Sequence, residues 1–371
     1  MKNVVIDARH ATKTIDGLGR YIIELINGLS GLPTLPKIII LHTNDFPFDG
    51  ISNINAFTFH LVNIKGGSPK QHMVLPFVIR KLKANVYFYP FIDPPFFSPA
   101  RINIYAVHDL NHFFFSPYAA TTSHLAIIMA KFFIYTSSIR YKKIVVFSEF
   151  VKQQLNNQIP FSRSKTITIY HGYTAFDNIL MNDPLIDQSL MKEKFILYIG
   201  NNRPHKNLER LFKAFELLNQ KLPEVKLIVA GNQIPRFFNI DEYITNSPAK
   251  DSFIRINKPS NSYLAFLYKH AELVAYPSLS EGFGFPLLEA WAFKAAIVTS
   301  NATCIPEIAG DAAEYFNPFD IVDISKSIQK VIENEDLKKQ LITQGSVRLQ
   351  NYNWSTSAAA HLQLFMDIHQ N

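Results

Sequence analysis

The chain has 371 residues, of which 47% are hydrophobic and 18% charged, so its composition excludes a disordered protein and indicates a globular one. A chain of this length is expected to form two domains. The single cysteine excludes an intramolecular disulfide. The N-terminus lacks the apolar run of a signal peptide, so we expect a cytoplasmic protein.

The formal net charge is +7, which favours an anionic partner. We find no helix-turn-helix, ribonucleoprotein or zinc pattern, so nucleic acid is not the expected partner. No apolar run approaches the roughly 20 residues that a membrane-spanning helix needs. These properties leave a sugar nucleotide or a phospholipid surface as candidate anionic partners.

Apolar runs alternate with helix-like stretches through the N-terminal half. We expect strands at residues 2–7, 37–42, 57–62, 86–89, 102–107, 143–147 and 166–170, and helices at 21–29, 69–82 and 121–139. Alternating strands and helices predict a mostly parallel sheet with helices on both faces. Residues 1–173 are therefore expected to form one Rossmann-like α/β domain.

Gly17 and Gly19 stand between the first expected strand and the first expected helix. A strand, a glycine-bearing turn and a helix form the first half of a nucleotide-binding unit, because glycine lets a ligand approach the backbone. A simple turn explains two glycines before a helix equally well. His108 follows the strand at 102–107, at the end of the sheet where ligands gather, and there it can bind a hydroxyl or transfer a proton. A histidine that merely caps the strand is the alternative.

The expected helix at 121–139 is apolar nearly all round, which predicts a buried helix. Arg140, Lys142 and Lys143 follow it, and the alternative is a helix face that rests on a membrane. The aromatic segments 91–97 and 113–115 are interrupted by prolines or border one, which predicts loops. Their rings either pack beneath the loops or form an apolar lip for a lipid-linked or glycan acceptor.

A polar linker at 174–192 leads to a second expected domain at 193–354. Strands are expected at 194–199, 225–230, 253–256, 274–276 and 296–299, and helices at 208–222, 261–270, 321–333, 337–349 and up to 368. After the first of these strands comes a glycine and then a loop with Arg203 and Lys206. These side chains can bring positive charge to a diphosphate, or they form an ordinary solvated surface.

Residues 276–291, YPSLSEGFGFPLLEAW, read as a strand end, a glycine turn and a helix opened by Pro286. Glu281 lies in the turn and Glu289 about one turn into the helix. Between them, the amides of Phe283, Gly284 and Phe285 can face an anion at the positive end of the helix dipole. The alternative is a loop glutamate and a surface glutamate with no shared ligand.

Residues 281–290, EGFGFPLLEA, resemble the E-x7-E signature of the retaining glycosyltransferases of family 4, which have the GT-B fold. The likeness continues through 306–313 and 317–320, and through the glycine, lysine and asparagine at 200, 206 and 207. The resemblance implies two Rossmann-like domains with parallel sheets facing a central cleft. It also implies a C-terminal helix, residues 355–371, that crosses back to the first domain.

The resemblance implies roles for the candidate site residues. Glu281 would bind the sugar hydroxyls, Glu289 the ribose, and Lys206 the diphosphate. His108 would contact the donor sugar from the first domain, and the loop with Gly17 and Gly19 would lie near the donor phosphates. Many family members have arginine where this chain has Asn201, so Arg203 is the candidate replacement.

The function implied is transfer of a hexose, with mannose favoured, from a nucleotide diphosphate sugar such as GDP-mannose. The acceptor would be a glycan or a polyprenyl-linked sugar in the synthesis of a bacterial surface polysaccharide such as O-antigen or capsule. No Asp-x-Asp pair is present, so neither a metal nor another cofactor is expected. The protein would be cytoplasmic, with peripheral contact to the inner face of the membrane as an option. The alternatives are a GT-B sugar-nucleotide epimerase and a non-catalytic protein that binds sugar nucleotides or glycans.

Overall fold

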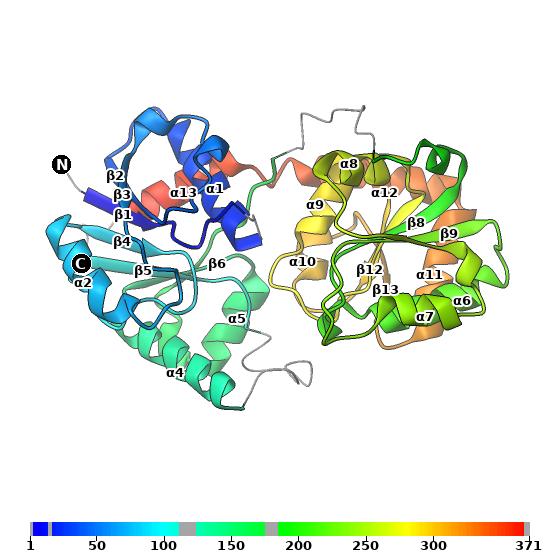
Figure 1. Cartoon of the computed structure of the whole chain (residues 1–371), viewed down its shortest axis with the longest axis horizontal. Helices are drawn as coiled ribbons and strands as arrows, with labels where there is room; N and C mark the ends of the chain where they lie inside the picture. Colours follow the sequence, from blue (N-terminus) through cyan, green and yellow to red (C-terminus); the bar gives the residue numbers. More distant parts are fainter. Residues whose placement is uncertain (1–2, 14–16, 111–123, 175–184, 367–371) are drawn as a thin grey trace. The chain divides into compact units, whose positions relative to one another are not determined.

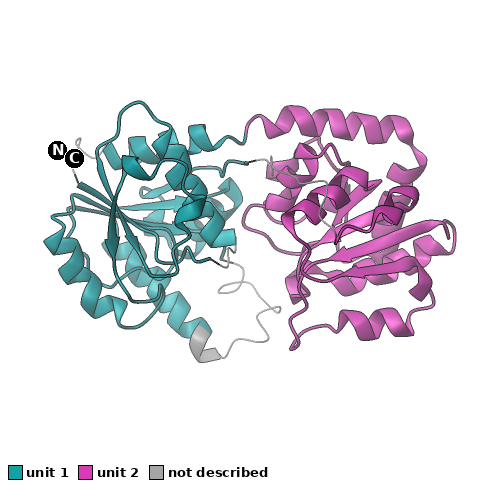
Figure 2. Ribbon diagram, turned by 45° about the horizontal axis from the view of Figure 1, so that its top comes forward, with its two compact units in different colours: residues 1–174, 352–371 teal, residues 175–351 magenta. Residues whose placement is uncertain are grey.

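The computed structural model describes residues 3–13, 17–110, 124–174 and 185–366. The chain divides into two compact units, shown in Figure 2. Unit 1 comprises residues 1–174 together with 352–371, and unit 2 comprises residues 175–351. The C-terminal segment therefore belongs to the same unit as the N-terminus.

Unit 1 is built on a parallel sheet of seven strands in the order β3-β2-β1-β4-β5-β6-β7. The strands are β1 (Asn3–Asp7), β2 (Lys37–His42), β3 (Thr58–Leu61), β4 (Val86–Tyr89), β5 (Ile102–Val107), β6 (Lys143–Val146) and β7 (Thr166–Thr168). The inner strands read as nearly continuous apolar runs because helices cover both faces of the sheet. The expected strands of this half are confirmed to within two residues at each end.

The helices of unit 1 are α1 (Gly17–Ser30), α2 (Gln71–Lys81), α4 (His124–Arg140), α5 (Glu149–Gln158) and α13 (Trp354–Met366), labelled in Figure 1. One face of the sheet packs against apolar side chains of α2, α4 and α5, such as Leu75 and Ile134. The last helix, α13, packs on α1, where a β-carbon on Gly28 would meet that of Ala358 at 2.8 Å. Residue 28 must therefore be glycine for the two helices to approach this closely.

A buried hydrogen bond also joins α13 to α1. Nδ1 of His361 donates to the carbonyl of Ser357 over 2.8 Å, so Nδ1 carries the proton of the neutral imidazole. Nε2 of His361 is then an acceptor, and the hydroxyl of Tyr21 donates to it over 2.9 Å. Burial lowers the pKa of His361 to about 4, so its imidazole is neutral at physiological pH. The C-terminal helix is thus fastened to unit 1 by both packing and a polar contact.

Unit 2 repeats the design with a parallel sheet of six strands in the order β10-β9-β8-β11-β12-β13. The strands are β8 (Lys194–Ile199), β9 (Val225–Ala230), β10 (Phe253–Ile256), β11 (Leu273–Tyr276), β12 (Ile297–Ser300) and β13 (Glu314–Phe316). The helices are α6 (Leu208–Asn219), α7 (Ile240–Asn246), α8 (Asn261–His270), α9 (Phe285–Ala292), α10 (Ile305–Ala309), α11 (Ile321–Glu333) and α12 (Glu335–Leu349). Every strand expected in this half is present, whereas β13 is an addition that the sequence analysis missed.

Each sheet has one point where the strand order reverses. In unit 1 it lies between β1 and β4, and in unit 2 between β8 and β11. Loops that leave the carboxyl ends of two such strands diverge and form a crevice, where open α/β sheets bind their ligands. These two positions are where functional side chains are to be sought.

Two expectations for unit 1 are wrong. Helix α1 begins at Gly17, so Gly17 and Gly19 lie in its first turn and not in a loop before it. The low helix propensity of glycine predicts a turn, but α1 is stabilised by the buried side chains that follow, such as Tyr21, Ile22 and Leu25.

The second wrong expectation is a buried α4. Ile134 is fully buried, but the helix exposes a stripe of large apolar side chains, at Ile128, Phe132, Tyr135 and Ile139. An apolar composition without helical periodicity cannot reveal which face is covered. In the part of the chain that the structure describes, no helix has the length and apolar character needed to cross a bilayer.

Candidate functional site

The loop that follows β8 is held in place by an asparagine. It forms a short 3-10 helix, Pro204–Lys206, and ends at Asn207 in a left-handed conformation with φ of 59°. The side-chain amide of Asn207 donates to the backbone carbonyls of Pro277 and Pro318 over 3.1 and 2.7 Å. These two hydrogen bonds join the loops after β8, β11 and β13. Lys206 is therefore presented from a fixed backbone at the carboxyl edge of the sheet.

The loop that follows β11 is held from the other side. The amide of Glu281 donates to Oγ1 of Thr303 over 3.1 Å, and the thiol of Cys304 donates to the carbonyl of Glu281 over 3.3 Å. Gly284, with φ of +106°, then reverses the chain into α9, whose second residue is Pro286. Glycine tolerates this conformation and proline suits the helix start, as the sequence predicted.

Lys206 and Glu281 meet at the reversal point of unit 2. The ammonium Nζ lies 2.6 Å from the carboxylate Oε1, and the side chains are only 16% and 14% exposed. Burial alone raises the pKa of Glu281, but the charges of Lys206 and His205 and the bond from Lys206 outweigh it and lower that pKa below 4.5. The carboxylate is therefore ionised at neutral pH.

This pair leaves binding capacity on both partners. An ammonium group has three protons and a carboxylate two oxygens, and the ion pair uses one of each. The ammonium can also attract a phosphate, and the carboxylate can accept hydrogen bonds from hydroxyl groups. The arrangement suits a ligand that has a negative group next to hydroxyls.

The other predicted residues of unit 2 have different surroundings. Glu289 is 8% exposed, and its Oε2 accepts a hydrogen bond of 2.7 Å from the hydroxyl of Tyr268 in α8. Phe283 is buried and Phe285 half-buried, so their rings belong to the packing of the turn. Arg203 is exposed at the start of the loop that carries Lys206. The structure therefore brings Lys206 and Glu281 into contact and leaves Arg203 in solvent.

In unit 1, His108 follows directly on β5, as predicted. Its Nε2 donates to the carbonyl of Pro90 over 2.9 Å, and its ring packs at 4.4 Å from the ring of Phe147 and 5.1 Å from that of Tyr21. The ring is half-buried and its orientation is fixed by these contacts.

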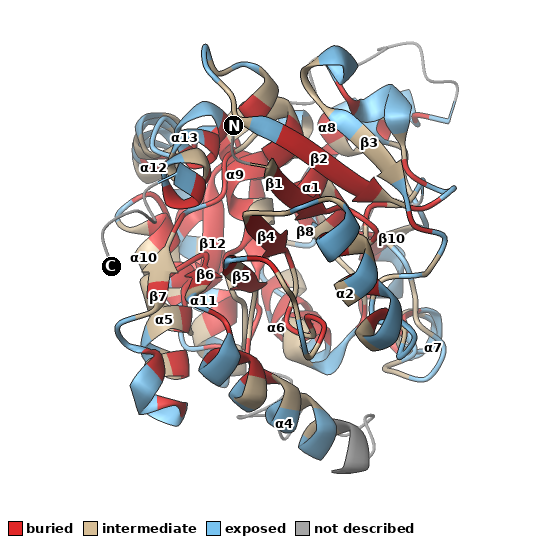
Figure 3. Ribbon diagram, turned by 90° about the vertical axis from the view of Figure 1, so that its left-hand side faces the viewer, coloured by how far each residue is buried: buried red, intermediate tan, exposed pale blue. Residues whose placement is uncertain are grey.

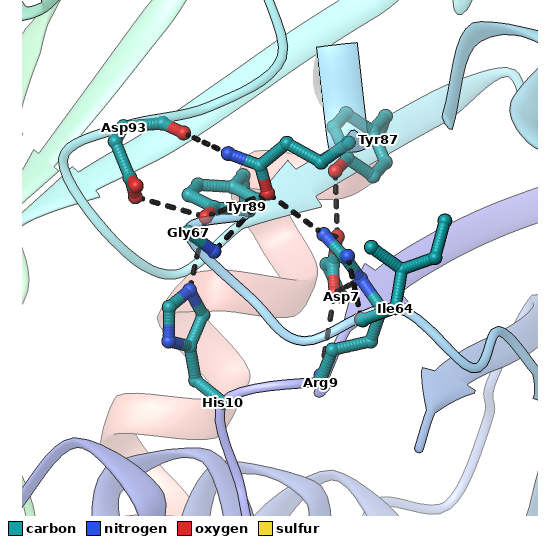
Figure 4. Close-up of polar contacts among 9 residues, drawn as sticks. Asp7, Arg9, His10, Ile64, Gly67, Tyr87, Tyr89 and Asp93 are labelled. Atoms are coloured by element: carbon teal, nitrogen blue, oxygen red, sulfur yellow. Dashed lines mark hydrogen bonds and ion pairs between the residues drawn. The ribbon is translucent and has the colours of Figure 1, made fainter. Parts of the chain in front are cut away.

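The reversal point of unit 1 has a polar cluster that the sequence analysis missed (Figure 4). Asp7, the last residue of β1, and Arg9, two residues later, form a fully buried ion pair of 2.8 Å. The hydroxyl of Tyr87 donates to Asp7 over 2.7 Å, and Arg9 donates to the carbonyl of Ile64 and to Gln71. These contacts fix the loops beside β1 and β4.

A second part of this cluster lies at the same edge, where Tyr89 is buried and His10 and Asp93 are half-buried. The hydroxyl of Tyr89 donates to Oδ1 of Asp93 over 2.9 Å and lies 2.9 Å from Nε2 of His10 (Figure 4). Burial raises the pKa of Asp93 to about 6, and the bond from Tyr89 offsets only part of that effect. A carboxyl with a perturbed pKa in such a crevice is a candidate functional group.

Residues 185–348 match the family model described as "Glycosyl transferases group 1". This segment is a glycosyl transferases group 1 domain. It includes both partners of the Lys206–Glu281 pair as well as Glu289 and Arg203. The candidate site of unit 2 therefore lies within the family's domain. Among the described residues, no group of three or more His, Cys, Asp or Glu side chains is arranged to hold a metal ion.

Two curated relatives from Escherichia coli show the extent of the likeness. The serotype-specific mannosyltransferase WbdA is 30% identical over 192 residues, which are 50% of this chain and 23% of WbdA. The chain thus spans about a quarter of the length of that relative. The O-antigen chain mannosyltransferase B is 24% identical over 372 residues, which cover 92% of this chain and 93% of that protein.

Among solved structures, the sucrose-phosphate synthase from Thermosynechococcus elongatus is similar over 99% of both chains, with a TM-score of 0.76 and 16% identity. This likeness concerns the fold. With the two parallel sheets, it confirms the predicted GT-B class of two Rossmann-like halves.

Proposed function

We propose that the protein is a retaining glycosyltransferase that moves a hexose, with mannose favoured, from a nucleotide diphosphate sugar to a glycan or lipid-linked acceptor. The single observation that carries this proposal is the Lys206–Glu281 pair at the reversal point of a glycosyl transferases group 1 domain. It places a cation and an ionised carboxylate together where an α/β sheet binds its ligand.

The chemistry of the pair fits the departure of a nucleoside diphosphate. As the sugar–phosphate bond breaks, negative charge grows on the leaving diphosphate, and Lys206 stabilises it with a cation that is already in place. Glu281 accepts hydrogen bonds from sugar hydroxyls and so orients the ring. Arg203, exposed on the same loop, supplies a second cation to the diphosphate when the donor binds.

Three further assignments complete the donor site. Glu289, whose carboxylate is oriented by Tyr268, binds the ribose hydroxyls. The helix dipole of α9, which begins after Gly284, favours a phosphate near residues 283–285. His108 in unit 1 contacts the donor sugar. With no covalent nucleophile assigned, the acceptor oxygen attacks from the face that the phosphate leaves, and a phosphate oxygen takes the acceptor's proton.

We further propose that GDP-mannose is the donor. We also propose that the reaction needs no metal ion, because the Lys206 ammonium supplies the positive charge that a metal ion would supply elsewhere. The setting proposed is the synthesis of a bacterial surface polysaccharide. The names of the two relatives, a serotype-specific mannosyltransferase and an O-antigen chain mannosyltransferase, support this choice.

The test is incubation of the full chain with radiolabelled GDP-mannose in EDTA, with and without a polyprenyl-diphosphate-linked oligosaccharide. We expect label in the acceptor, or slow release of mannose when no acceptor is present. Glu281→Gln should lower either rate at least 100-fold, whereas Glu333→Gln, an exposed glutamate in α11 of the same unit, should not change it. Release of an altered sugar would identify an epimerase, and binding without turnover a non-catalytic protein; either result refutes the proposal.

A further inference from the structure

The excess positive charge of the chain is confined to one segment. Residues 50–148 contain 10 Lys and Arg but only 2 Asp and Glu, a net charge of +8. The rest of the chain has 27 basic and 28 acidic residues (37 − 10 and 30 − 2), a net charge of −1. The basic residues are therefore not scattered evenly, because this segment of unit 1 accounts for all of the excess.

The same segment exposes large apolar side chains on two helices. On α2, Met73 and Phe77 are each 75% exposed and lie four residues apart on one face. On α4, Ile128, Phe132, Tyr135 and Ile139 are 51 to 61% exposed and recur every three or four residues along one stripe. Each helix thus turns an apolar stripe to solvent while its opposite side packs on the sheet.

Aromatic contacts show that the two helices are neighbours. The ring of His72 on α2 stacks with that of Phe133 on α4, with centroids 5.5 Å apart. The ring of Phe96 lies against both, at 4.4 and 5.0 Å. Figure 3 shows the exposed surfaces of α2 and α4 on the same side of unit 1. We call this surface the α2–α4 face, defined by the exposed residues Met73, Phe77, Phe97, Ile128, Phe132, Tyr135 and Ile139.

Exposed cations flank this face. The C-terminal end of α2 and the turn after it contribute Arg80, Lys81 and Lys83, and α4 and its end contribute Lys131, Arg140 and Lys142. The two acidic residues of the segment are Asp93, which accepts a hydrogen bond from Tyr89, and Asp109, and both are half-buried. The α2–α4 face therefore combines apolar area with cations and has no exposed carboxylate among residues 50–110 and 127–148.

We propose that the α2–α4 face binds the surface of an anionic phospholipid bilayer. The apolar side chains enter the boundary between headgroups and acyl chains, and the lysines and arginines contact lipid phosphates. A nucleic acid would use the cations but leave the exposed apolar stripes in water. A second copy of the chain would bring two cationic rims together. A bilayer satisfies both features of the face.

The experiment is vesicle flotation of the full chain at 0.1 M NaCl. The vesicles are phosphatidylcholine alone, or phosphatidylcholine with 30% phosphatidylglycerol. We expect the protein to float with the anionic vesicles, to stay behind with the neutral ones, and to be released from the anionic ones in 1 M NaCl. Absence from the anionic vesicles at 0.1 M NaCl overturns the proposal.

Matched variants locate the surface. Phe77→Ser with Ile128→Ser, at 75% and 61% exposure, should weaken binding at least tenfold. Leu185→Ser with Val347→Ser removes apolar side chains of unit 2 that are 74% and 62% exposed, and should leave binding unchanged. Equal effects of the two pairs overturn the assignment to the α2–α4 face.

A charge-reversed pair tests the same surface without removing apolar contacts. Each cation lost from the face should leave about a tenth to a fifth of the affinity. Lys81→Glu with Lys142→Glu should therefore weaken binding by about 30-fold or more. Lys326→Glu with Lys339→Glu, exposed on α11 and α12, should have a small effect. The alternative is that the face binds a second copy of the chain. The proposal is refuted if the wild-type protein does not float with the vesicles but forms dimers in light scattering, and if Phe77→Ser dissociates those dimers.

Discussion

Removing one partner of the Lys206–Glu281 ion pair is expected to destabilise unit 2 about as much as removing both. The attraction of two unit charges at 2.6 Å is about 6 kcal/mol at an effective dielectric constant of about 20. Desolvation offsets most of that attraction, because each side chain is about 85% removed from water and each buried ion costs several kcal/mol. Each single variant, however, leaves a buried charge without its partner.

We therefore expect Glu281→Gln and Lys206→Met each to lower the free energy of unfolding by about 3 kcal/mol. The double variant should also lose about 3 kcal/mol instead of the additive 6, which gives a coupling energy of about 3 kcal/mol. The chain has two tryptophans, Trp291 in unit 2 and Trp354 in unit 1. In a Trp354→Phe background, fluorescence during urea unfolding reports on unit 2 alone.

The chain offers a matched control for this cycle. Glu209 and Lys213 form an ion pair of nearly the same length, 2.7 Å, on the exposed surface of α6, at 57% and 45% exposure. Solvent screens this pair, so its coupling energy should be below about 0.5 kcal/mol. If the Lys206–Glu281 cycle gives a coupling no larger than this control, the argument from burial is refuted.

Three further changes test the structure. Burial raises the pKa of Asp93 from 3.8 to about 6. As the pH rises from 4 to 6, the unfolded chain loses this proton more readily than folded unit 1 does. The contribution of Asp93 to the stability of unit 1 therefore falls over this pH range. Asp93→Asn still accepts the hydrogen bond from Tyr89, and it should stabilise unit 1 by about 1–3 kcal/mol at pH 7.5 and by much less at pH 4. An equal gain in stability at both pH values would contradict the raised pKa of Asp93. Burial lowers the pKa of His361 to about 4, so this group's own contribution to the stability of unit 1 should fall by about 2 kcal/mol between pH 6.5 and 5. His361→Gln removes that contribution, and the expectation fails if the variant and wild type change in stability equally over this pH range. Gly231 has a φ of +132°, and a β-carbon there would collide with the carbonyl oxygen of Gly200. Gly231→Ala should therefore lower the free energy of unfolding of unit 2 in urea by about 3 kcal/mol or more. Gly17→Ala, whose β-carbon would meet nothing within 4 Å, should lower that of unit 1 by less than about 1 kcal/mol.

The strands were predictable because buried parallel strands are continuous apolar runs. β5 and β9 illustrate this, since only one residue in each is not buried. β13 has three residues and buries Phe316 alone, so it gives no such signal. The start of α1 was missed because glycine has a low helix propensity, and the side-chain burial that stabilises the helix after Gly17 is a tertiary effect.

The site was predictable in its parts but not in its assembly. Glu281 and Lys206 each stood out from a local glycine turn or basic loop. Their contact, across 75 residues of sequence, depends on β8 lying next to β11. Asp93 was missed for the same reason, because its meeting with the residues after β1 depends on β4 pairing with β1.

The exposure of α4 also depends on tertiary structure. Its composition fixes neither which side faces the sheet nor whether a second layer covers the other side. Only with α2 beside it does the apolar stripe become part of one surface flanked by cations.

The central claim is that unit 2 binds a nucleoside diphosphate through the Lys206 ammonium without a metal ion. Isothermal titration of GDP into the full chain in EDTA tests it most directly. We predict saturable binding to wild type, binding at least 100-fold weaker to Lys206→Met, and unchanged binding to Lys213→Met. Equal affinity of wild type and Lys206→Met, or binding that appears only when Mg²⁺ is added, would contradict the account.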